Sequence, residues 1–137
     1  MGYKYKFSII SAVYKVEEFV AETIESLISQ TIGFKNIQLI LVDDGSPDGS
    51  GAICDKYAAK YDNILVIHKE NGGVSSARNA GLEKVEGKYV NFIDSDDLLT
   101  PSTLKRVWEF FEAHEDETDV VSIPLFFFDG RTGNHHL

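Results

Sequence analysis

The chain has 137 residues, which is the size of one domain. Hydrophobic residues make up 43% and charged residues 26%, so the chain can bury a core and is not of the disordered class. The formal net charge of -9 excludes a general nucleic-acid binder, because such proteins gain most of their affinity from Lys and Arg at phosphates.

The cysteine count and the hydropathy pattern indicate a cytoplasmic protein. Cys54 is the single cysteine, which excludes an internal disulfide and suits a reducing compartment. No run approaches the roughly 18 apolar residues of a membrane span. The apolar segment 7–13 is short and is interrupted by Ser8 and Ser11, so it does not resemble a signal peptide. We expect residues 1–6 to be a disordered or tag-derived N-terminus.

Strand-like and helix-like segments alternate along the chain. We expect strands over residues 7–13, 37–42, 64–67, 89–93 and 119–123. Helices are expected to begin near Val16, at Ser46-Pro47, at Val74 and at Thr100-Pro101, with Gly87 ending the third helix. This alternation predicts an α/β fold with a doubly wound, mostly parallel sheet.

Polar residues follow each of the first four predicted strands. They are Tyr14-Lys15, Asp43-Asp44-Gly45-Ser46, the segment 68–73, and Asp94-Ser95-Asp96-Asp97. Ligands of open α/β sheets bind beyond the carboxyl ends of the strands, where these four segments would meet. The sequence therefore predicts one ligand site at that edge.

The acidic run 94–97 predicts a metal site. Three carboxylates at one strand end repel one another and raise each other's pKa. A hard divalent cation with oxygen ligands offsets that repulsion, and Mg²⁺ or Mn²⁺ bound by few protein ligands usually shares its shell with a substrate phosphate.

Two other features have alternative interpretations. Asp43-Asp44-Gly45-Ser46 is either an ordinary turn with a helix cap or an acceptor for a base N–H or a ribose hydroxyl. Arg78, in the glycine-containing segment 71–81, is either an anion-binding fork or half of an ion pair with a nearby Asp. His68 is interpreted as a strand-end residue and Cys54 as a small buried hydrophobe.

The four segments at the strand ends resemble motifs of the inverting glycosyltransferases of family 2, which have the GT-A fold. The matching stretches are Ser8 to Tyr14, Val42 to Ser46, Asn71 to Gly81, and Asp94 to Asp97. Family members commonly have Pro where Ala12 stands and Asn where Lys15 stands. The resemblance implies that residues 7–128 are a nucleotide-sugar-binding domain, Rossmann-like in architecture.

The resemblance also implies roles for individual residues. The donor, a nucleotide-diphosphate sugar and by expectation a UDP-sugar, would contact Ala12, Tyr14, Glu17, Asp44, Arg78, Asp94 and Ser95. Ala12 and Tyr14 would line the base pocket, and Asp44 would accept from the base N–H. In the D-x-D motif, Asp94 would lie near the ribose and Asp96 would bind Mn²⁺ or Mg²⁺, while Asp97 would support the turn.

The family's catalytic base lies downstream, in an acceptor-binding half. We therefore expect it outside this chain, with residues 129–137 as a tail leading to that half, so that the chain is a domain fragment inactive by itself. The expected acceptor is a saccharide or a cell-surface glycan, with function in polysaccharide biosynthesis. Membrane association would come from regions beyond the chain, and the aromatic run 126–128 could support self-association.

Two alternative functions are open at this point. A receiver domain also clusters acids around Mg²⁺, but it would need an acidic pair after the first strand and a lysine after the fifth. Here the first strand ends in Tyr14, and the fifth runs into Ile123-Pro124-Leu125. A non-catalytic nucleotide- or metal-binding module is the second alternative, because binding residues and catalytic residues are separable.

Overall fold

The computed structural model describes residues 2–115, 127–128 and 135–136. The chain divides into two compact units, Met1–Arg106 and Val107–Leu137, which are described separately. The strand predicted at 119–123 lies outside the described residues.

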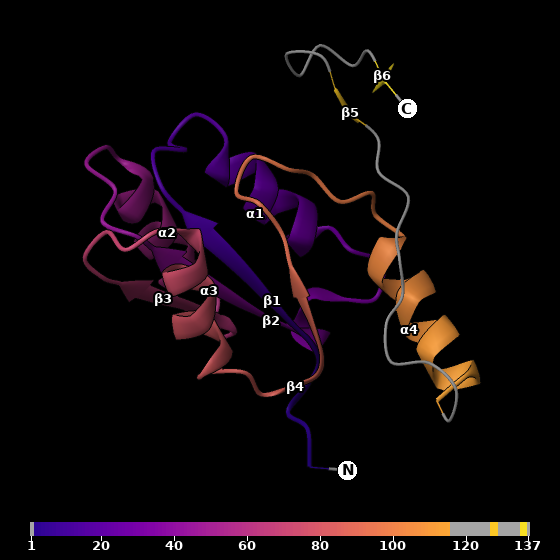
Figure 1. Ribbon diagram of the computed structural model, residues 1–137. Helices are drawn as coiled ribbons and strands as arrows, with labels where there is room; N and C mark the ends of the chain where they lie inside the picture. The colour runs from indigo at the N-terminus through magenta and orange to yellow at the C-terminus, as the bar shows by residue number, and fades with distance from the viewer. Residues whose placement is uncertain (1, 116–126, 129–134, 137) are drawn as a thin grey trace. The chain divides into compact units, whose positions relative to one another are not determined.

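The first unit is built on a four-stranded sheet (Figure 1). Its strands are β1 (Tyr5–Val13), β2 (Ile37–Asp43), β3 (Ile64–His68) and β4 (Gly87–Phe92). The spatial order is β3-β2-β1-β4, and every neighbouring pair is parallel. Val13 pairs with Asp43, and Asp43 with His68, so the carboxyl ends of these strands lie level at one edge. The predicted α/β architecture with a parallel sheet is confirmed.

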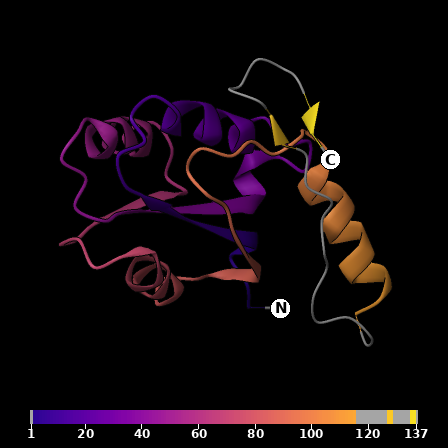
Figure 2. The ribbon, with the colours of Figure 1, turned by 45° about the horizontal axis from the view of Figure 1, so that its top comes forward.

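Helices cover both faces of this sheet, as a doubly wound fold requires. Figure 2 shows α1 (Val20–Ile28) and α2 (Ser50–Ala58) on one face and α3 (Val74–Leu82) on the other. A short 3₁₀ turn, η1 (Phe34–Asn36), precedes β2. None of the helices in the described part of the chain is long and apolar enough to span a bilayer.

The core follows from the alternation of side chains along the strands. Ile10 of β1 and Ile40 and Val42 of β2 point to one face, where they pack with Ala77 of α3. Their neighbours in sequence point to the opposite face, which α1 and α2 cover. Each large side chain buried in this way contributes roughly 1.5–3 kcal/mol to folding, and together they fix the register of the strand ends.

The expected starts of three helices are wrong by a few residues. The helix expected from Val16 begins at Val20, after a turn in which the Val20 N–H donates to the Val16 carbonyl. The helix expected from Thr100-Pro101 is α4 (Thr103–Ala113). The apolar periodicity was correct in both cases, but it extends into a turn that precedes the regular helix.

The predicted cap at Ser46-Pro47 is also wrong, because α2 begins at Ser50. The N–H of Ser46 donates to Asp43 Oδ1 at 3.0 Å, which closes a turn directly after β2. The N–H of Ser50 instead finds its acceptor in Asp48 Oδ1, also at 3.0 Å. The Ser46 hydroxyl, which was expected to cap the helix, instead donates to the Val13 carbonyl at 3.2 Å.

Gly87 does not end a helix. α3 ends at Leu82, and Gly87 is the first residue of β4. Its N–H donates to Ser8 Oγ at 2.8 Å, and a Cβ atom at this position would lie 2.5 Å from the Ser8 backbone nitrogen. Glycine is needed here because β1 and β4 approach closely, which the sequence pattern did not reveal.

The second unit contains the end of α4 and a short antiparallel pair, β5 (Phe127–Phe128) with β6 (His135–His136). Residue 126 and residues 129–134 lie outside the described part. The expected self-association through the aromatic run, and the interpretation of residues 129–137 as a connecting tail, stay predictions.

Candidate functional site

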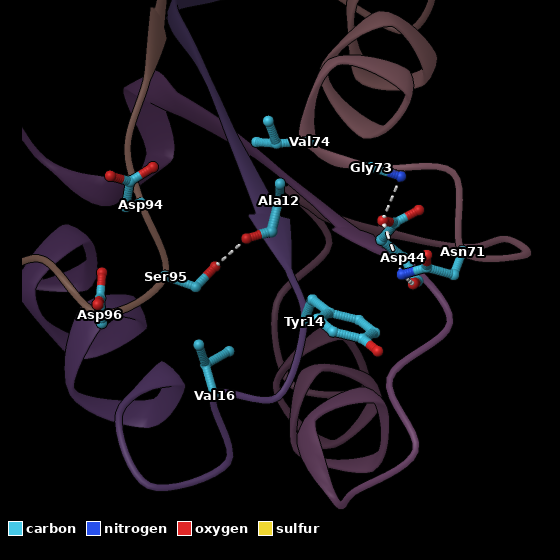
Figure 3. A pocket seen from close by; sticks show the side chains of 10 residues that line it. All are labelled: Ala12, Tyr14, Val16, Asp44, Asn71, Gly73, Val74, Asp94, Ser95 and Asp96. Atoms are coloured by element: carbon cyan, nitrogen blue, oxygen red, sulfur yellow. Dashed lines mark hydrogen bonds between the residues drawn. The ribbon is translucent and has the colours of Figure 1, made fainter.

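A hollow of about 370 Å³ lies at the carboxyl edge of the sheet (Figure 3). Its wall is formed by residues at the ends of β1, β2 and β4, in the loop before α3, and at the start of α3. These are Ala12, Tyr14, Val16, Asp44, Asn71, Gly73, Val74, Asp94, Ser95 and Asp96. The volume is within the range of small-molecule sites. Because the wall contains residues from several strand ends, these ends lie together as the sequence predicted.

One part of the hollow is apolar. Tyr14 is 42% exposed and Val74 50% exposed, and both line the hollow. Figure 3 shows the small side chain of Ala12 between them. A planar ring could cover this surface and remove it from water, and stacking of a base on an aromatic side chain contributes about 1–3 kcal/mol.

Asp44 lies in the wall and is 3% exposed. Its Oδ1 accepts from the Gly72 N–H at 3.0 Å and from Lys69 Nζ at 3.1 Å, and its Oδ2 accepts from the Gly73 N–H at 3.0 Å and from Asn71 Nδ2 at 3.3 Å. Burial raises the pKa of Asp44, but these donors outweigh it, so that the pKa lies below its usual 3.8. Asp44 therefore holds the loop between β3 and α3.

The acidic turn, defined as Asp94 to Asp97, lies after β4. The N–H of Asp97 donates to the Asp94 carbonyl at 3.0 Å, which closes the turn. Carboxylate oxygens of Asp94, Asp96 and Asp97 all lie within 4.8 Å of one another, and all three residues are exposed. Arg78 Nη2 is 3.5 Å from Asp94 Oδ1, a long, solvent-exposed ion pair. The donor set and the spacing fit a hard divalent cation such as Mg²⁺ or Mn²⁺.

Ser95 differs from its three acidic neighbours because it is buried. Its hydroxyl donates to the Ala12 carbonyl at 2.8 Å, and the Ser11 hydroxyl lies 2.5 Å from it. Since the Ser95 proton is committed to a carbonyl, Ser11 is the donor in the second contact. Ser95 thus attaches the acidic turn to β1, although it was expected to contact the donor molecule.

Glu17 and Arg78 were predicted to contact the donor, but neither is among the described residues that line the hollow. Glu17 Oε2 accepts from the Gly49 N–H at 2.9 Å and so braces the loop before α2. The Arg78 guanidinium carbon lies 5.4 Å from the centroid of the Phe92 ring. For Arg78 the ion-pair interpretation is the one that the geometry supports.

A second cluster of titratable groups joins the ends of β2 and β3 to α2. His68 Nδ1 is 2.8 Å from Asp43 Oδ2, and His68 Nε2 is 2.8 Å from Asp55 Oδ1. Hydrogen bonds to Asp43 and then to Asp55 raise the pKa of His68 above 6.5. Cys54 is fully buried, and burial raises its pKa to about 12, so it is the small hydrophobe that was expected.

Four residues of the wall were not predicted individually: Val16, Asn71, Gly73 and Val74. The sequence did single out the segment that contains Asn71, Gly73 and Val74, for its glycines. Gly73 has a φ of +94°, which side-chain-bearing residues rarely adopt. Val16 was assigned to the helical core because it fits the apolar period of α1, so no sequence signal separated it from core residues.

The family model and the similar proteins all point to the same family. Residues 8–137 match "Glycosyl transferase family 2". The "Minor teichoic acid biosynthesis protein GgaB" of Bacillus subtilis (strain 168) is 55% identical over 99% of this chain, which covers 15% of that protein. The "Poly(ribitol-phosphate) beta-glucosyltransferase" of Bacillus spizizenii is 34% identical over 92% of this chain and 20% of its own length.

Solved structures show the same fold. The structure of S. aureus TarS residues 1–349 in complex with UDP-GlcNAc has a TM-score of 0.75 and 36% identity, over 80% of this chain and 32% of TarS 1–349. A mannosyltransferase from Pyrobaculum calidifontis, in complex with GDP-Man and Mn²⁺, has a TM-score of 0.63 at 21% identity, which shows the GT-A fold alone. The chain spans 15% to 33% of the length of GgaB and the two further B. subtilis relatives EpsJ and GgaA.

Proposed function

We propose, from the premise that this chain belongs to glycosyl transferase family 2, that it forms the donor-binding part of a glycosyltransferase that uses a UDP-sugar. The observation that carries the proposal is the composition of the hollow. An apolar surface suited to a base belongs to the same cavity wall as Asp94 and Asp96, two of the three carboxylates that converge in the acidic turn. A nucleotide diphosphate with a divalent cation offers the matching groups, a planar base at one end and a metal-bound diphosphate at the other.

The apolar part would take the base. Tyr14 and Val74 would cover its ring, and Ala12 would leave room for close approach. The base N–H was expected to donate to Asp44, whose two oxygens already accept from four groups of the chain. A base N–H that reaches Asp44 has to share an oxygen with one of these donors, and the Asn71 amide, with the longest contact at 3.3 Å, is the easiest to displace.

The acidic turn would hold Mn²⁺ or Mg²⁺. Asp96 is the proposed metal ligand, and the convergence of oxygens adds Asp97 and Asp94 as further candidates. Asp94 is also the proposed contact of a ribose hydroxyl. When bound, the cation neutralises charge that develops on the diphosphate leaving group. Arg78 would orient the Asp94 carboxylate through its ion pair.

The acceptor is proposed from the relatives. GgaB is named for teichoic acid biosynthesis, and the B. spizizenii relative for glucosyl transfer to poly(ribitol-phosphate). We infer a cell-surface glycan or polyol-phosphate polymer as the acceptor class, with transfer on the cytoplasmic side, where a reduced Cys54 is stable. The proposal includes no residue for the general base.

Calorimetric titration of the chain with UDP in the presence of Mn²⁺ tests this function. We expect saturable binding at one site. Asp96→Ala and Tyr14→Ala should each weaken this binding, the first at the cation and the second at the base. Absence of binding, or Asp96→Ala behaving like the parent, would contradict it. Incubation with acetyl phosphate separates the receiver alternative, since the proposal expects no phosphorylated aspartate. UDP binding without any sugar transfer by the complete protein would favour the non-catalytic module.

A further inference from the structure

A stripe of polar side chains runs along α1, on the side that faces the segment after β4. Thr23 and Ser26 lie three residues apart on one face of α1, and Gln30 continues their line just past the end of the helix, where its Nε2 donates to the Ser26 carbonyl at 3.1 Å. Thr23 is 1% exposed and Gln30 is 3% exposed. We call these three residues the polar stripe. Buried polar groups inside a helix lower stability unless they are hydrogen-bonded, so their partners are informative.

Thr23 contacts the acidic turn directly. Its Oγ1 lies 2.8 Å from the Ser95 carbonyl and 2.7 Å from the Asp97 carbonyl. The hydroxyl has one proton, which these two carbonyls share, and both belong to the backbone that carries the carboxylates of Asp96 and Asp97. The hydroxyl of Thr23 therefore holds the acidic turn in place through two of the turn's carbonyl groups, those of Ser95 and Asp97.

Ser26 and Gln30 hold the chain that follows. The Leu99 N–H donates to Ser26 Oγ at 3.3 Å, and Gln30 Nε2 donates to the Thr100 carbonyl at 2.7 Å. Gln30 Oε1 accepts from the Leu104 N–H at 3.1 Å. Figure 1 shows this irregular segment, from the end of β4 to the start of α4, running alongside α1. The polar stripe therefore supplies hydrogen bonds to this segment in addition to the backbone bonds that Ile93 makes to Ile10 and that Thr31 makes to Pro101.

A second anchor acts from the sheet. Ser11 of β1 donates to Ser95 Oγ, and Ser95 donates to the Ala12 carbonyl. The Ser95 side chain is therefore attached to β1 while its carbonyl is attached to α1 through Thr23. With both its side chain and its carbonyl bound, Ser95 points inward, and the carboxylates on either side of it, Asp94 and Asp96, are exposed.

We propose that the polar stripe of α1, with Thr23 as its central member, positions the acidic turn for divalent cation binding. The inference rests on the proposed function, because it assigns positioning residues to the cation site. A preorganised turn loses less conformational entropy when it binds the cation than a turn that the cation has to order. Groups that orient metal ligands without touching the metal commonly change its affinity by 10–100-fold.

Three variants of the chain test the proposal. Thr23→Val keeps the shape and removes the hydroxyl, Thr23→Ser keeps the hydroxyl, and Ile24→Val removes one methyl group from a buried neighbour on the same helix. We expect Thr23→Val to weaken Mn²⁺ binding, measured by calorimetry with UDP present, by about tenfold. Thr23→Ser and Ile24→Val should stay within about twofold of the parent, and UDP binding without metal should be unchanged in all three. Parental affinity in Thr23→Val, or equal losses in Thr23→Val and Ile24→Val, would overturn the proposal.

Amide hydrogen exchange, recorded without metal or nucleotide, measures how firmly the acidic turn is held, independently of cation binding. The amides of Asp97 and Leu99, which donate to the Asp94 carbonyl and to Ser26 Oγ, should exchange faster in Thr23→Val and not in Ile24→Val. If the parent binds no Mn²⁺, the cation site of the proposed function fails, and this exchange result alone decides whether the stripe holds the turn. Unchanged exchange would overturn it. Should Thr23→Val not fold, Ser26→Ala, at a less buried position, is expected to give the same pattern at Leu99.

Discussion

Two acidic strand ends face the same edge of this sheet, and their carboxylates are in opposite situations. Asp43, the last residue of β2, and Asp44, directly after it, are buried and accept hydrogen bonds from the chain itself. Asp94, Asp96 and Asp97, after β4, are exposed and converge to within 4.8 Å. The acids at one strand end are thus buried among donors of the chain, and those at the other end are exposed to solution.

The difference comes from the chain around each run. The acids after β2 lie between two parallel neighbours, and the loop that follows β3 brings Lys69 and the N–H groups of Gly72 and Gly73 to Asp44. The acids after β4 follow a strand at one end of the four-stranded order, whereas β2 is an inner strand. Acidic residues at a strand end therefore do not by themselves indicate a metal. Burial and the donors around Asp44 distinguish its structural carboxylate from carboxylates that a cation in solution can reach.

The largest effect should come from neutralising Asp44. In Asp44→Asn, an amide NH₂ would face the donors of Gly72, Gly73 and Lys69, and we expect the free energy of unfolding to fall by about 3 kcal/mol. Urea denaturation measures it. The matched variant Asp94→Asn, at an exposed carboxylate, should stay within about 0.5 kcal/mol of the parent. Equal losses in the two variants would remove the distinction between the strand ends.

A smaller loss is expected when the packing of α2 against the β2 end is disturbed. A Cβ atom on Gly51 would collide with Asp43 Oδ2, so Gly51→Ala should lower the free energy of unfolding by about 2 kcal/mol. Gly49→Ala is the control. Its Cβ would meet only Glu17 Oε2, at the movable end of an exposed side chain, and we expect a change within about 0.5 kcal/mol. If neither variant changed the free energy of unfolding, α2 would not be packed closely against Asp43.

Neutralising Asp96 should affect binding and leave folding intact. We expect Asp96→Asn to weaken Mn²⁺ binding at least about tenfold, because a charged oxygen ligand becomes neutral. Its free energy of unfolding without metal should change by no more than about 0.5 kcal/mol, since the residue is exposed. Calorimetry and urea denaturation measure the two quantities on one preparation. A stability loss as large as that of Asp44→Asn would show that this turn, too, is mainly structural.

The smallest effect concerns His68 and pH. Its pKa is higher in the folded chain than the ordinary 6.5, so protonated His68 stabilises the fold fully below pH 6.5, and this contribution is lost as the pH rises through the folded pKa. Half of the His68 side chain is exposed, so we expect less than about 1 kcal/mol. The stability difference between the parent and His68→Gln should therefore shrink from pH 6 to pH 9. A difference that grows over that range would contradict the assignment.

The sequence predicted the sheet and the edge at which the site lies, for a physical reason. Apolar runs such as Ile37–Asp43 are long enough to be strands, and parallel strands put their carboxyl ends on one edge. Tyr14 and Asp96 both line the hollow, as their places after predicted strands led us to expect. Local pattern and topology carry the same information about position there, while the roles of the two residues in binding stay predictions.

The partners of each polar group could not be read from the sequence. Asp44 receives its donors from residues 25 to 29 positions later, and Thr23 bonds carbonyls 72 and 74 positions away. Analysis of α1 by apolar period skips Thr23, because it registers hydrophobic residues only. Ser46-Pro47 was misassigned because Ser46 bonds back to the strand ends, through its N–H to Asp43 and through its hydroxyl to the Val13 carbonyl. Such contacts depend on tertiary distances that no local pattern contains.

Paramagnetic broadening by Mn²⁺ in amide spectra of the chain, recorded with UDP present, tests the contrast between the two strand ends most directly. We predict that broadening begins at Ser95, Asp96 and Asp97 at the lowest Mn²⁺ additions and reaches Asp43 and Asp44 only at higher ones, and that Asp96→Asn removes the early effect. Broadening that begins at Asp43 and Asp44, or that Asp96→Asn leaves unchanged, would contradict the assignment of the acidic turn as the cation site.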